Sequence, residues 1–497
     1  MQSTLVQHRH LILTTLFLTC ILTSFYLFYT PSQAAVHHTA QKKPKQPITL
    51  CDQVDAAWLA SDRIYWDGWK DKAMFMKRDG TLTKGNVYIE QDQDVCIVVL
   101  LGPTPAKASI RDEQNDHIGP RDSIVMFANG QYTKKTIQLN QHTEQSNVYM
   151  AAVHFSQPDT YELNASTEYR HFFWETPILH AYHPFQFQSQ NKLIVQPSKR
   201  EAKKTCNATS LEGTWVDQAK LAEYDPYMLH QMYENAEIQH SVVNKVFVPD
   251  TCQLNYVSIG KVAECLGRQT VHVWADQHVK RNLKALDQPE WCNLEAIAEL
   301  DDPEARKAAF RCNCNEIGED PTWWKDSDQP LILDNSLNVH ARFYVHSLQG
   351  ALVSERDRFI QQMELANHTD QADWVIVGIG NDDIEALQVT PKQFEAHLIR
   401  FFEQLRKIYP HQRVIVRTPQ YFCCSTREGS SWNTGRSLAM TVAMRQVVQN
   451  QPNMVLWDVH QLGTDETSCF LTQGSTYSKR HVVNTENQFL WRLLCLA

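Results

Sequence analysis

Short hydrophobic runs separated by turn residues dominate the first third of the chain. Four of these runs are NVYIE (86–90), VCIVVLL (95–101), DSIVMFA (122–128) and NVYMAAVHF (147–155). β-Branched and aromatic runs of this length, bounded by glycine, proline and asparagine, are typical of β-strands. Their spacing predicts an antiparallel, Ig-like β-sandwich over residues 51–182.

The hydrophobic pattern changes in the second half, where continuous apolar runs alternate with helix-like segments. The runs are TVHV (270–273), FYVHSL (343–348), WVIVGIG (374–380), RVIVRT (413–418) and MVLWDV (454–459). Such alternation indicates a parallel sheet with helices on both faces. We therefore predict a doubly wound α/β domain over residues 206–497. The polar and basic residues 183–205 before it are predicted to be a linker.

The ends of one helix in this region are marked clearly in the sequence. Thr390 is a good N-cap, Pro391 suits the first turn, and Gln393 completes a capping box. Pro410 marks the end of the helix. Apolar residues then recur at helical spacing, at Phe394, Leu398, Phe401, Phe402, Leu405 and Ile408. This face is predicted to pack on the sheet.

A long uncharged segment lies near the N-terminus. Residues 11–29 form a 19-residue apolar stretch that ends in an aromatic cluster, close to the roughly 20 residues needed to cross a bilayer. We predict a transmembrane signal anchor at 11–29, a cytosolic tail at 1–10 and a stem at 30–50. The alternative is a signal peptide cleaved near residues 32–34, which would give a secreted protein.

The orientation of that segment is not decided by its flanking charges. Lys42, Lys43 and Lys45 follow the span, and the positive-inside rule therefore does not favour a luminal body. Cysteines and glycosylation motifs point the other way. Asn164, Asn207 and Asn367 each begin a sequon. We therefore predict a single-pass type II membrane glycoprotein facing the Golgi or endoplasmic-reticulum lumen.

The cysteines and the net charge indicate where the protein folds and exclude some kinds of partner. Twelve of the 13 cysteines lie outside the apolar span, an even number that fits disulfides in an oxidising compartment. The spacings at Cys312 and Cys314 and at Cys423 and Cys424 do not match zinc sites. No metal and no cofactor are predicted. A net charge of -9 argues against a nucleic-acid partner.

One turn in the second half stands where serine esterases often hold a nucleophile. The run at 270–273 is followed by Ala275, Asp276, Gln277 and His278, and then by a helix-like segment. This turn contains no serine. We found no Gly-x-Ser-x-Gly elsewhere in the chain that would supply a replacement nucleophile.

Several further motifs carry a family resemblance. Cys206 precedes Gly-Thr-Trp at 213–215, and FVPDTCQLNY at 247–256 precedes Cys265. Together these motifs resemble the PC-esterase family, over residues 206–495. The family is a branch of the SGNH (GDSL-like) superfamily found in neurexophilin-related proteins, plant cell-wall acetyltransferases and fungal Golgi proteins. The resemblance implies a glycan esterase or acyltransferase, and we expect Cys265 to be bonded to Cys495.

The first catalytic block of that family is altered here. The family has Gly-Asp-Ser followed by Arg-Asn on a helix, and Asp276, Arg281 and Asn282 match this pattern. Ala275 replaces the glycine and Gln277 replaces the serine nucleophile. A carboxamide cannot form the attacking alkoxide, and losing such a nucleophile costs roughly six orders of magnitude in turnover.

The other blocks are partly kept. Asn381 stands where the resemblance implies an oxyanion-hole donor. The family's Asp-x-x-His pair, which activates the serine, is missing from 474–478. His481 comes a few residues late, and the Asp-Val-His at 458–460 comes early.

Three hypotheses follow from this pattern. In the first, the chain is a pseudoenzyme that binds a glycan or polysaccharide, or assists an active acyltransferase, and no catalytic residue is assigned. In the second, it is an active glycan acyltransferase or acyl esterase with relocated residues, with His278 as base and Asp276 orienting a partner. In the third, it is an adhesion-like surface protein that acts through its β-sandwich.

Overall fold

The computed structural model describes much of the chain between residue 71 and residue 495, and Cys51. The segments outside this description are 1–50, 52–70, 82, 103–120, 144, 171–184, 200–202, 208–211, 235–244, 288–302, 304–330, 335–339, 367–371, 386–388, 422–433, 464–468, 473–474, 479 and 496–497. The tail, anchor and stem predicted over 1–50, the cysteines at 292, 312, 314, 423 and 424, and the sequon asparagine at 367 lie outside the described residues. None of the described helices is long and apolar enough to cross a membrane.

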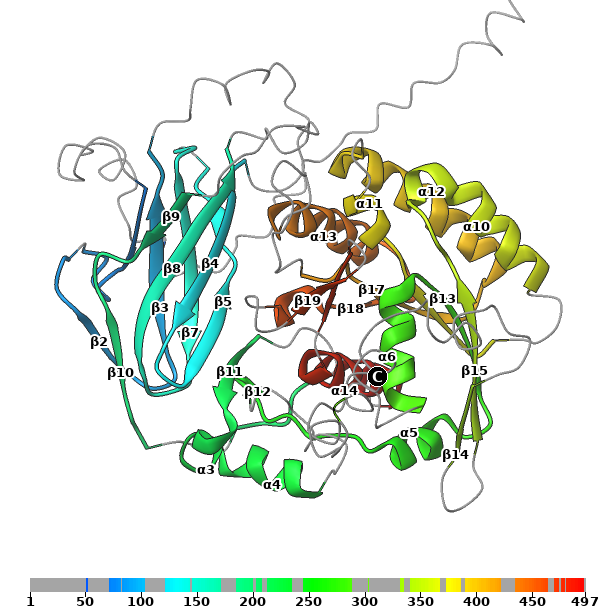
Figure 1. Cartoon of the computed structure of the whole chain (residues 1–497), viewed down its shortest axis with the longest axis horizontal. Helices are drawn as coiled ribbons and strands as arrows, with labels where there is room; N and C mark the ends of the chain where they lie inside the picture. The colour runs from blue at the N-terminus through cyan, green and yellow to red at the C-terminus, as the bar shows by residue number, and fades with distance from the viewer. Residues whose placement is uncertain are drawn as a thin grey trace, which may run out of the picture. The chain divides into compact units, whose positions relative to one another are not determined.

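Two sheets form the N-terminal part of the compact unit, which spans Thr49–Ala497 (Figure 1). The first sheet is antiparallel, in the order β1-β3-β7-β6. Its strands are β1 (Lys72–Phe75), β3 (Gln93–Leu100), β6 (Asn140–Gln141) and β7 (Val148–Phe155). The runs predicted at 95–101 and 147–155 are therefore confirmed as strands.

The second sheet has eight strands, in the order β12-β11-β5-β4-β8-β10-β2, with β9 paired to β8. They are β2 (Val87–Glu90), β4 (Ser123–Asn129), β5 (Thr133–Ile137), β8 (Thr160–Tyr169), β9 (Phe185–Gln188), β10 (Leu193–Gln196), β11 (Gly213–Asp217) and β12 (Lys245–Pro249). Only the β10 and β2 pair is parallel. The runs predicted at 86–90 and 122–128 are β2 and β4.

The two sheets share one buried cluster. Phe75 and Ile97 of the first sheet and Met126 and Leu163 of the second all belong to it. Burial alternates along β4, so that every second residue faces this cluster and the residues between face the other way.

The second sheet crosses two of the predicted boundaries. The range 183–205, predicted as a linker, contains β9 and β10, which both pair with β8. The strands β11 and β12 come from the range assigned to the α/β domain, and β11 pairs with β5. Main-chain hydrogen bonding between strands distant in sequence produces both features, and a local hydrophobic pattern does not encode it.

The C-terminal half contains a six-stranded sheet, in the order β14-β15-β13-β16-β17-β18. Its strands are β13 (Thr270–Ala275), β14 (Leu331–Asp334), β15 (His340–Ser347), β16 (Trp374–Gly378), β17 (Arg413–Arg417) and β18 (Met454–Trp457). Only the edge strand β14 is antiparallel, and the five parallel strands are the five predicted from the apolar runs. The structure is thus mixed α/β with several sheets.

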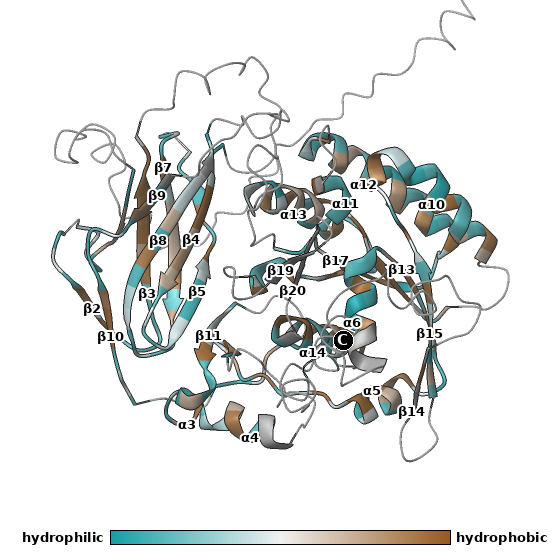
Figure 2. Ribbon diagram, in the orientation of Figure 1, coloured by the Kyte–Doolittle hydropathy of each residue, from teal (hydrophilic) through white to brown (hydrophobic). Residues whose placement is uncertain are grey.

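Helices cover both faces of this parallel sheet. Ile376 and Ile415 belong to the cluster that includes residues of α5, α6 and α14. Their strand neighbours Val377 and Val416 belong to the cluster of α10, α12 and α13. In Figure 2 the outer helices α10 and α12 carry teal as well as brown positions, as expected for half-buried helices. These helices are α5 (Ile259–Leu266), α6 (Gln277–Asp287), α10 (Leu352–Ala366), α12 (Pro391–Ile408), α13 (Thr434–Gln449) and α14 (Arg480–Cys495).

The remaining described elements are short. They are η5 (Gln218–Lys220), α3 (Leu221–Tyr224), α4 (Pro226–Glu234), α11 (Asn381–Glu385), η7 (His460–Leu462), β19 (Cys469–Thr472) and β20 (Ser475–Ser478).

The helix predicted from its ends is α12, and its capping box is confirmed. The Thr390 hydroxyl accepts from the Gln393 backbone N–H at 3.2 Å, and the Gln393 side chain accepts from the Thr390 backbone N–H at 3.0 Å. The phenylalanines at 394, 401 and 402 are fully buried. They are core residues, as predicted.

Three disulfides lie among the described residues. Cys51 is bonded to Cys96, and Cys206 is bonded to Cys252. The expected bond between Cys265 and Cys495 is confirmed, and it joins α5 to the end of α14.

Candidate functional site at the carboxyl ends of β13 and β16

Strand order alone locates the candidate site. Going along the chain from β13, the next strands, β14 and β15, lie on one side of it, and β16 lies on the other side. At such a reversal, open α/β sheets bind ligands in the crevice outside the carboxyl ends of the strands. Asp276 follows β13, and Asn381 follows β16 after two residues. The two predicted site residues therefore lie at these carboxyl ends.

Asp276 uses both of its carboxylate oxygens. Its Oδ1 accepts from the backbone N–H of His278 at 2.9 Å, which caps the first turn of α6. Its Oδ2 accepts from Asn381 Nδ2 at 2.7 Å. Burial by itself raises the pKa of Asp276. Nearby His278, the hydrogen bond from Asn381 and Arg417 lower it by more, so the pKa of Asp276 lies below its usual range.

Asn381 is held from both ends of its carboxamide. While Nδ2 donates to Asp276, Oδ1 accepts from the Gln420 backbone N–H at 3.0 Å. The turn before it requires glycine: Gly380 has φ of 105°, and a Cβ on Gly378 would lie 2.2 Å from Val279 Cγ2. The glycines thus bring Asn381 to within hydrogen-bonding distance of Asp276.

Gln277 and His278 begin α6 beside this pair. Gln277, which is predicted to stand in place of a serine nucleophile, is half-buried. His278 is buried, with Nδ1 3.4 Å from Asp276 Oδ1. The structure therefore brings together Asp276, His278 and Asn381, with Gln277 at the edge of the group.

Two more carboxylates follow Asn381 in α11, and the sequence analysis did not select them. Asp382 accepts from the Gly350 backbone N–H at 2.5 Å, and burial together with Asp276 raises its pKa. Asp383 accepts from the backbone N–H groups of Leu352 and Val353 at 2.8 and 3.1 Å, at the start of α10. Burial raises the pKa of Asp383 to about 7. The Asn-Asp-Asp sequence at 381–383, just after a predicted strand, was the signal in the sequence that could have identified these two carboxylates.

His481 lies at the start of α14. Its ring packs edge-on against Trp215 of β11, with ring centroids 5.2 Å apart. We therefore place it with β11 and not in the group around Asp276. The short strand β20 occupies the position where the family's Asp-x-x-His was expected.

A serine and a histidine that are distant in sequence also meet. Ser437 Oγ of α13 lies 3.0 Å from His460 Nε2, and both side chains are buried. The Ser437 hydroxyl also donates to the Thr434 carbonyl at 3.0 Å. Burial and the nearby Arg445 lower the pKa of His460 to about 3. The Asp-Val-His at 458–460 was noted in the sequence, but nothing there pointed to Ser437.

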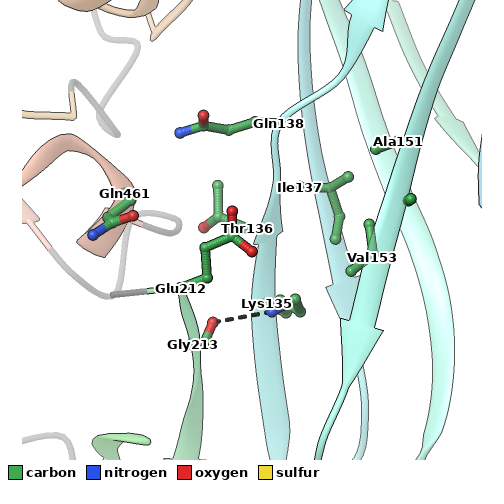
Figure 3. A pocket seen from close by; sticks show the side chains of 10 residues that line it. Lys135, Thr136, Ile137, Gln138, Ala151, Val153, Glu212, Gly213 and Gln461 are labelled. Atoms are coloured by element: carbon green, nitrogen blue, oxygen red, sulfur yellow. Dashed lines mark hydrogen bonds between the residues drawn. The ribbon is translucent and has the colours of Figure 1, made fainter. Parts of the chain in front are cut away.

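A small pocket lies between β5 and β11 (Figure 3). Its volume is about 90 Å³, and Lys135 at its wall donates to the Gly213 carbonyl at 3.4 Å. Lys135 also pairs with buried Asp250. The volume of this pocket is well below the roughly 300–1,000 Å³ of typical small-ligand sites, so we do not assign a ligand to it.

The sequon asparagines differ in their surroundings. Asn164 lies in the middle of β8 and is half-buried, and Asn207 is exposed beside the Cys206 disulfide.

No family model matches this chain, and no curated protein matches it. Solved structures with distant similarity include a carbohydrate esterase family 3 protein from Talaromyces cellulolyticus, at 14% identity and a TM-score of 0.29, covering 46% of this chain and 99% of that one. A carbohydrate acetylesterase from Xanthomonas citri has 8% identity and a TM-score of 0.25, covering 80% and 70%. A carbohydrate esterase family 2 enzyme with a carbohydrate-binding domain, from Corynascus thermopiles, has 7% identity and a TM-score of 0.26, covering 86% and 99%. Membership of the PC-esterase family stays a prediction.

Proposed function

We propose that the α/β half of this protein is an esterase-like domain that binds a carbohydrate in a crevice outside the carboxyl ends of β13 and β16 and does not perform serine acyl transfer there. The observation that carries the proposal is the 2.7 Å hydrogen bond between Asn381 Nδ2 and Asp276 Oδ2, beside Gln277. The carbohydrate class comes from the family resemblance of residues 206–495.

The chemistry of the group supports binding over catalysis. Gln277 offers an amide that can donate to and accept from a sugar hydroxyl, but it cannot act as a nucleophile. Asn381 directs one amide N–H at a carboxylate, which weakens its use as an oxyanion donor. His278 is close to Asp276, as the relocated-base hypothesis requires, but Gln277 has no proton for it to remove in an acyl transfer.

A fluorophosphonate probe on the full chain tests the absence of an activated serine. We expect no labelling above that of the heat-denatured protein. Labelling that one serine substitution removes would overturn the pseudoenzyme proposal.

Glycan-array binding tests the crevice itself. Asn381→Ala should lose binding by at least about tenfold, because it frees Asp276 and the Gln420 N–H. Asn450→Ala is the matched control, since Asn450 is exposed at the end of α13. Equal binding by both variants would exclude the crevice as the binding site.

The Ser437 and His460 pair gives the relocated-enzyme hypothesis a specific form. This alternative ranks second because the Ser437 hydroxyl has only one proton to donate. When that proton goes to the Thr434 carbonyl, His460 Nε2 must donate to Ser437 Oγ, and a protonated Nε2 cannot act as a base. A pKa of about 3 would also make His460 a weak base. Fluorophosphonate labelling lost in Ser437→Ala would favour this alternative.

We also propose that the protein is anchored by residues 11–29 and faces the Golgi or endoplasmic-reticulum lumen, where an active acyltransferase could be its partner. The three disulfides support an oxidising compartment. Protease protection of the body in intact microsomes, lost on adding detergent, is the expected result. Release of the body into the medium would favour the cleaved signal peptide.

The adhesion hypothesis keeps a structural basis as well. We propose that the two N-terminal sheets form the predicted Ig-like sandwich, because they share one buried cluster. Glycan binding that is unchanged in Asn381→Ala would indicate that these sheets contain the binding site.

A further inference from the structure

A groove lies on the face of the second sheet that points away from the shared core. Its volume is about 730 Å³, within the range of small-ligand sites. Its lining residues come from β4, β5, β8 and β9, and include Phe127, Asn129, Lys134, Asn164, Ser166 and Gln188.

Strand register arranges these side chains in rows across the sheet. Phe127 pairs with Asn164, and Asn164 pairs with Gln188. Alternation along β4 directs Phe127 and Asn129 to this face, because Met126 and Ala128 belong to the core cluster. An aromatic ring thus lies directly beside a row of carboxamides.

Two buried oxygen atoms in the groove lack protein partners. Asn129 Oδ1 and Asn164 Oδ1 are buried and make no hydrogen bond within the part of the chain that the structure describes. A buried acceptor without a donor is costly, and native proteins satisfy such atoms with water or a ligand. Both oxygens therefore call for a hydrogen-bond donor, supplied either by water or by a ligand in the groove.

The aromatic ring beside them is held in place. Tyr421 packs edge-on against Phe127 with ring centroids 6.3 Å apart, and Lys134 Nζ lies 4.8 Å from the Phe127 centroid. The described lining residues include amides, a hydroxyl and the Lys134 ammonium group, and no carboxylate. This disfavours a cationic ligand, and the amides and the ring favour one with several hydrogen-bond donors and an apolar face.

We propose that this groove binds a carbohydrate, with a sugar ring against Phe127 and with hydroxyl or acetamido N–H groups donating to Asn129 Oδ1 and Asn164 Oδ1. The site is separate from the crevice at Asp276 and does not depend on the function proposed there. The sugar can come from two sources: an oligosaccharide of another molecule, or a glycan on Asn164 itself, which begins the sequon Asn-Ala-Ser.

The first arm of the test concerns a glycan attached to Asn164. The full chain from glycosylating cells is treated, still folded, with a peptide N-glycosidase, and Asn164 is followed by mass spectrometry. A glycan seated in the groove should be released at least about tenfold more slowly than in Phe127→Ala. Phe127→Leu keeps the apolar contact with Tyr421 but lacks a flat ring. Faster glycan release from this folded variant would therefore reflect lost contact with the sugar and not misfolding. Tyr88→Ala, at an exposed position on β2, is the control.

The second arm concerns an external sugar. The full-length chain is made in a host that does not N-glycosylate, which leaves Asn164 and Ser166 unchanged. Triacetylchitotriose and cellotriose are titrated into this protein by calorimetry. Binding by either that weakens at least about tenfold with Phe127→Leu, and is unchanged with Asn450→Ala, supports an external sugar. The proposal is overturned if Asn164 carries no glycan protected by Phe127 and neither trisaccharide binds.

Discussion

At the scale of single residues, the candidate site is built around a carboxylate that also serves the fold. Asp276 caps α6 through Oδ1 and accepts from Asn381 through Oδ2. A helix cap alone would explain the first contact but not the second. The second joins the ends of two strands that are more than a hundred residues apart in sequence, and it is this contact that marks the crevice.

Placing a serine at position 277 should not produce an enzyme. Gln277→Ser supplies a hydroxyl, but the Asp-x-x-His base of the resembled PC-esterase family is absent from 474–478, and Asn381 already donates to Asp276. We expect no esterase turnover on p-nitrophenyl acetate above that of wild type. Turnover raised about a hundredfold would show that another residue acts as base.

Protonation of His460 should make stability depend on pH. Burial and Arg445 hold its pKa at about 3, below the unfolded value of 6.5. The unfolded chain therefore binds the proton first, and stability is lost as pH falls below about 6.5. Between pH 7.5 and 5 this loss amounts to about 2 kcal/mol.

His460→Gln removes the titrating group and keeps a hydrogen-bonding side chain near Ser437. Urea unfolding of both proteins at pH 7.5 and 5 measures the effect. The variant should lose about 2 kcal/mol less than wild type over this interval. An identical loss in both proteins would mean that His460 does not titrate in this range.

At the scale of elements, local sequence signals decide where helices and strands begin and end. The capping box at Thr390 and the apolar spacing after it were sufficient to predict α12. The five apolar runs likewise predicted the five parallel strands. These elements are the most predictable part of the fold, because their signals come from neighbouring residues.

Removing the cap of α12 should destabilise the protein modestly. Thr390→Ala leaves a backbone N–H at Gln393 without its acceptor and is expected to cost about 1 kcal/mol. Thr390→Ser keeps the hydroxyl and should recover most of the loss. Thermal unfolding of the two variants measures the difference, and equal melting temperatures would show that the capping box contributes little.

At the scale of the whole molecule, contacts between distant segments join the two halves. β11 extends the second sheet by pairing with β5, and Lys135 of β5 pairs with Asp250, which follows β12. The disulfide between Cys265 and Cys495 spans 230 residues of sequence. The C-terminal helix is thereby tied to the start of the α/β half.

Opening that disulfide should weaken the fold. In a variant with serine at both 265 and 495, the unfolded chain regains the entropy of a long loop, and we expect a loss of about 2–5 kcal/mol. Urea unfolding compares this variant with wild type. A variant with serine at both 51 and 96 is the matched control, and because its loop is shorter, at 45 residues, it should lose less. A larger loss in the control would contradict the loop-length argument.

The sequence by itself predicted the five parallel strands, α12, the α/β pattern and the candidate residues Asp276, His278 and Asn381. The resemblance to the PC-esterase family added the prediction that Gln277 stands in place of a nucleophile. Each of these was readable because hydrophobic period, capping chemistry and motif spacing are local properties.

Only the tertiary structure decided which distant residues meet. It joined Asp276 to Asn381 and Ser437 to His460, placed His481 against Trp215, and set Phe127 beside Asn164 in the groove. Strand order and register place these side chains together. Both depend on pairing between segments far apart along the chain, which a local hydrophobic pattern does not specify.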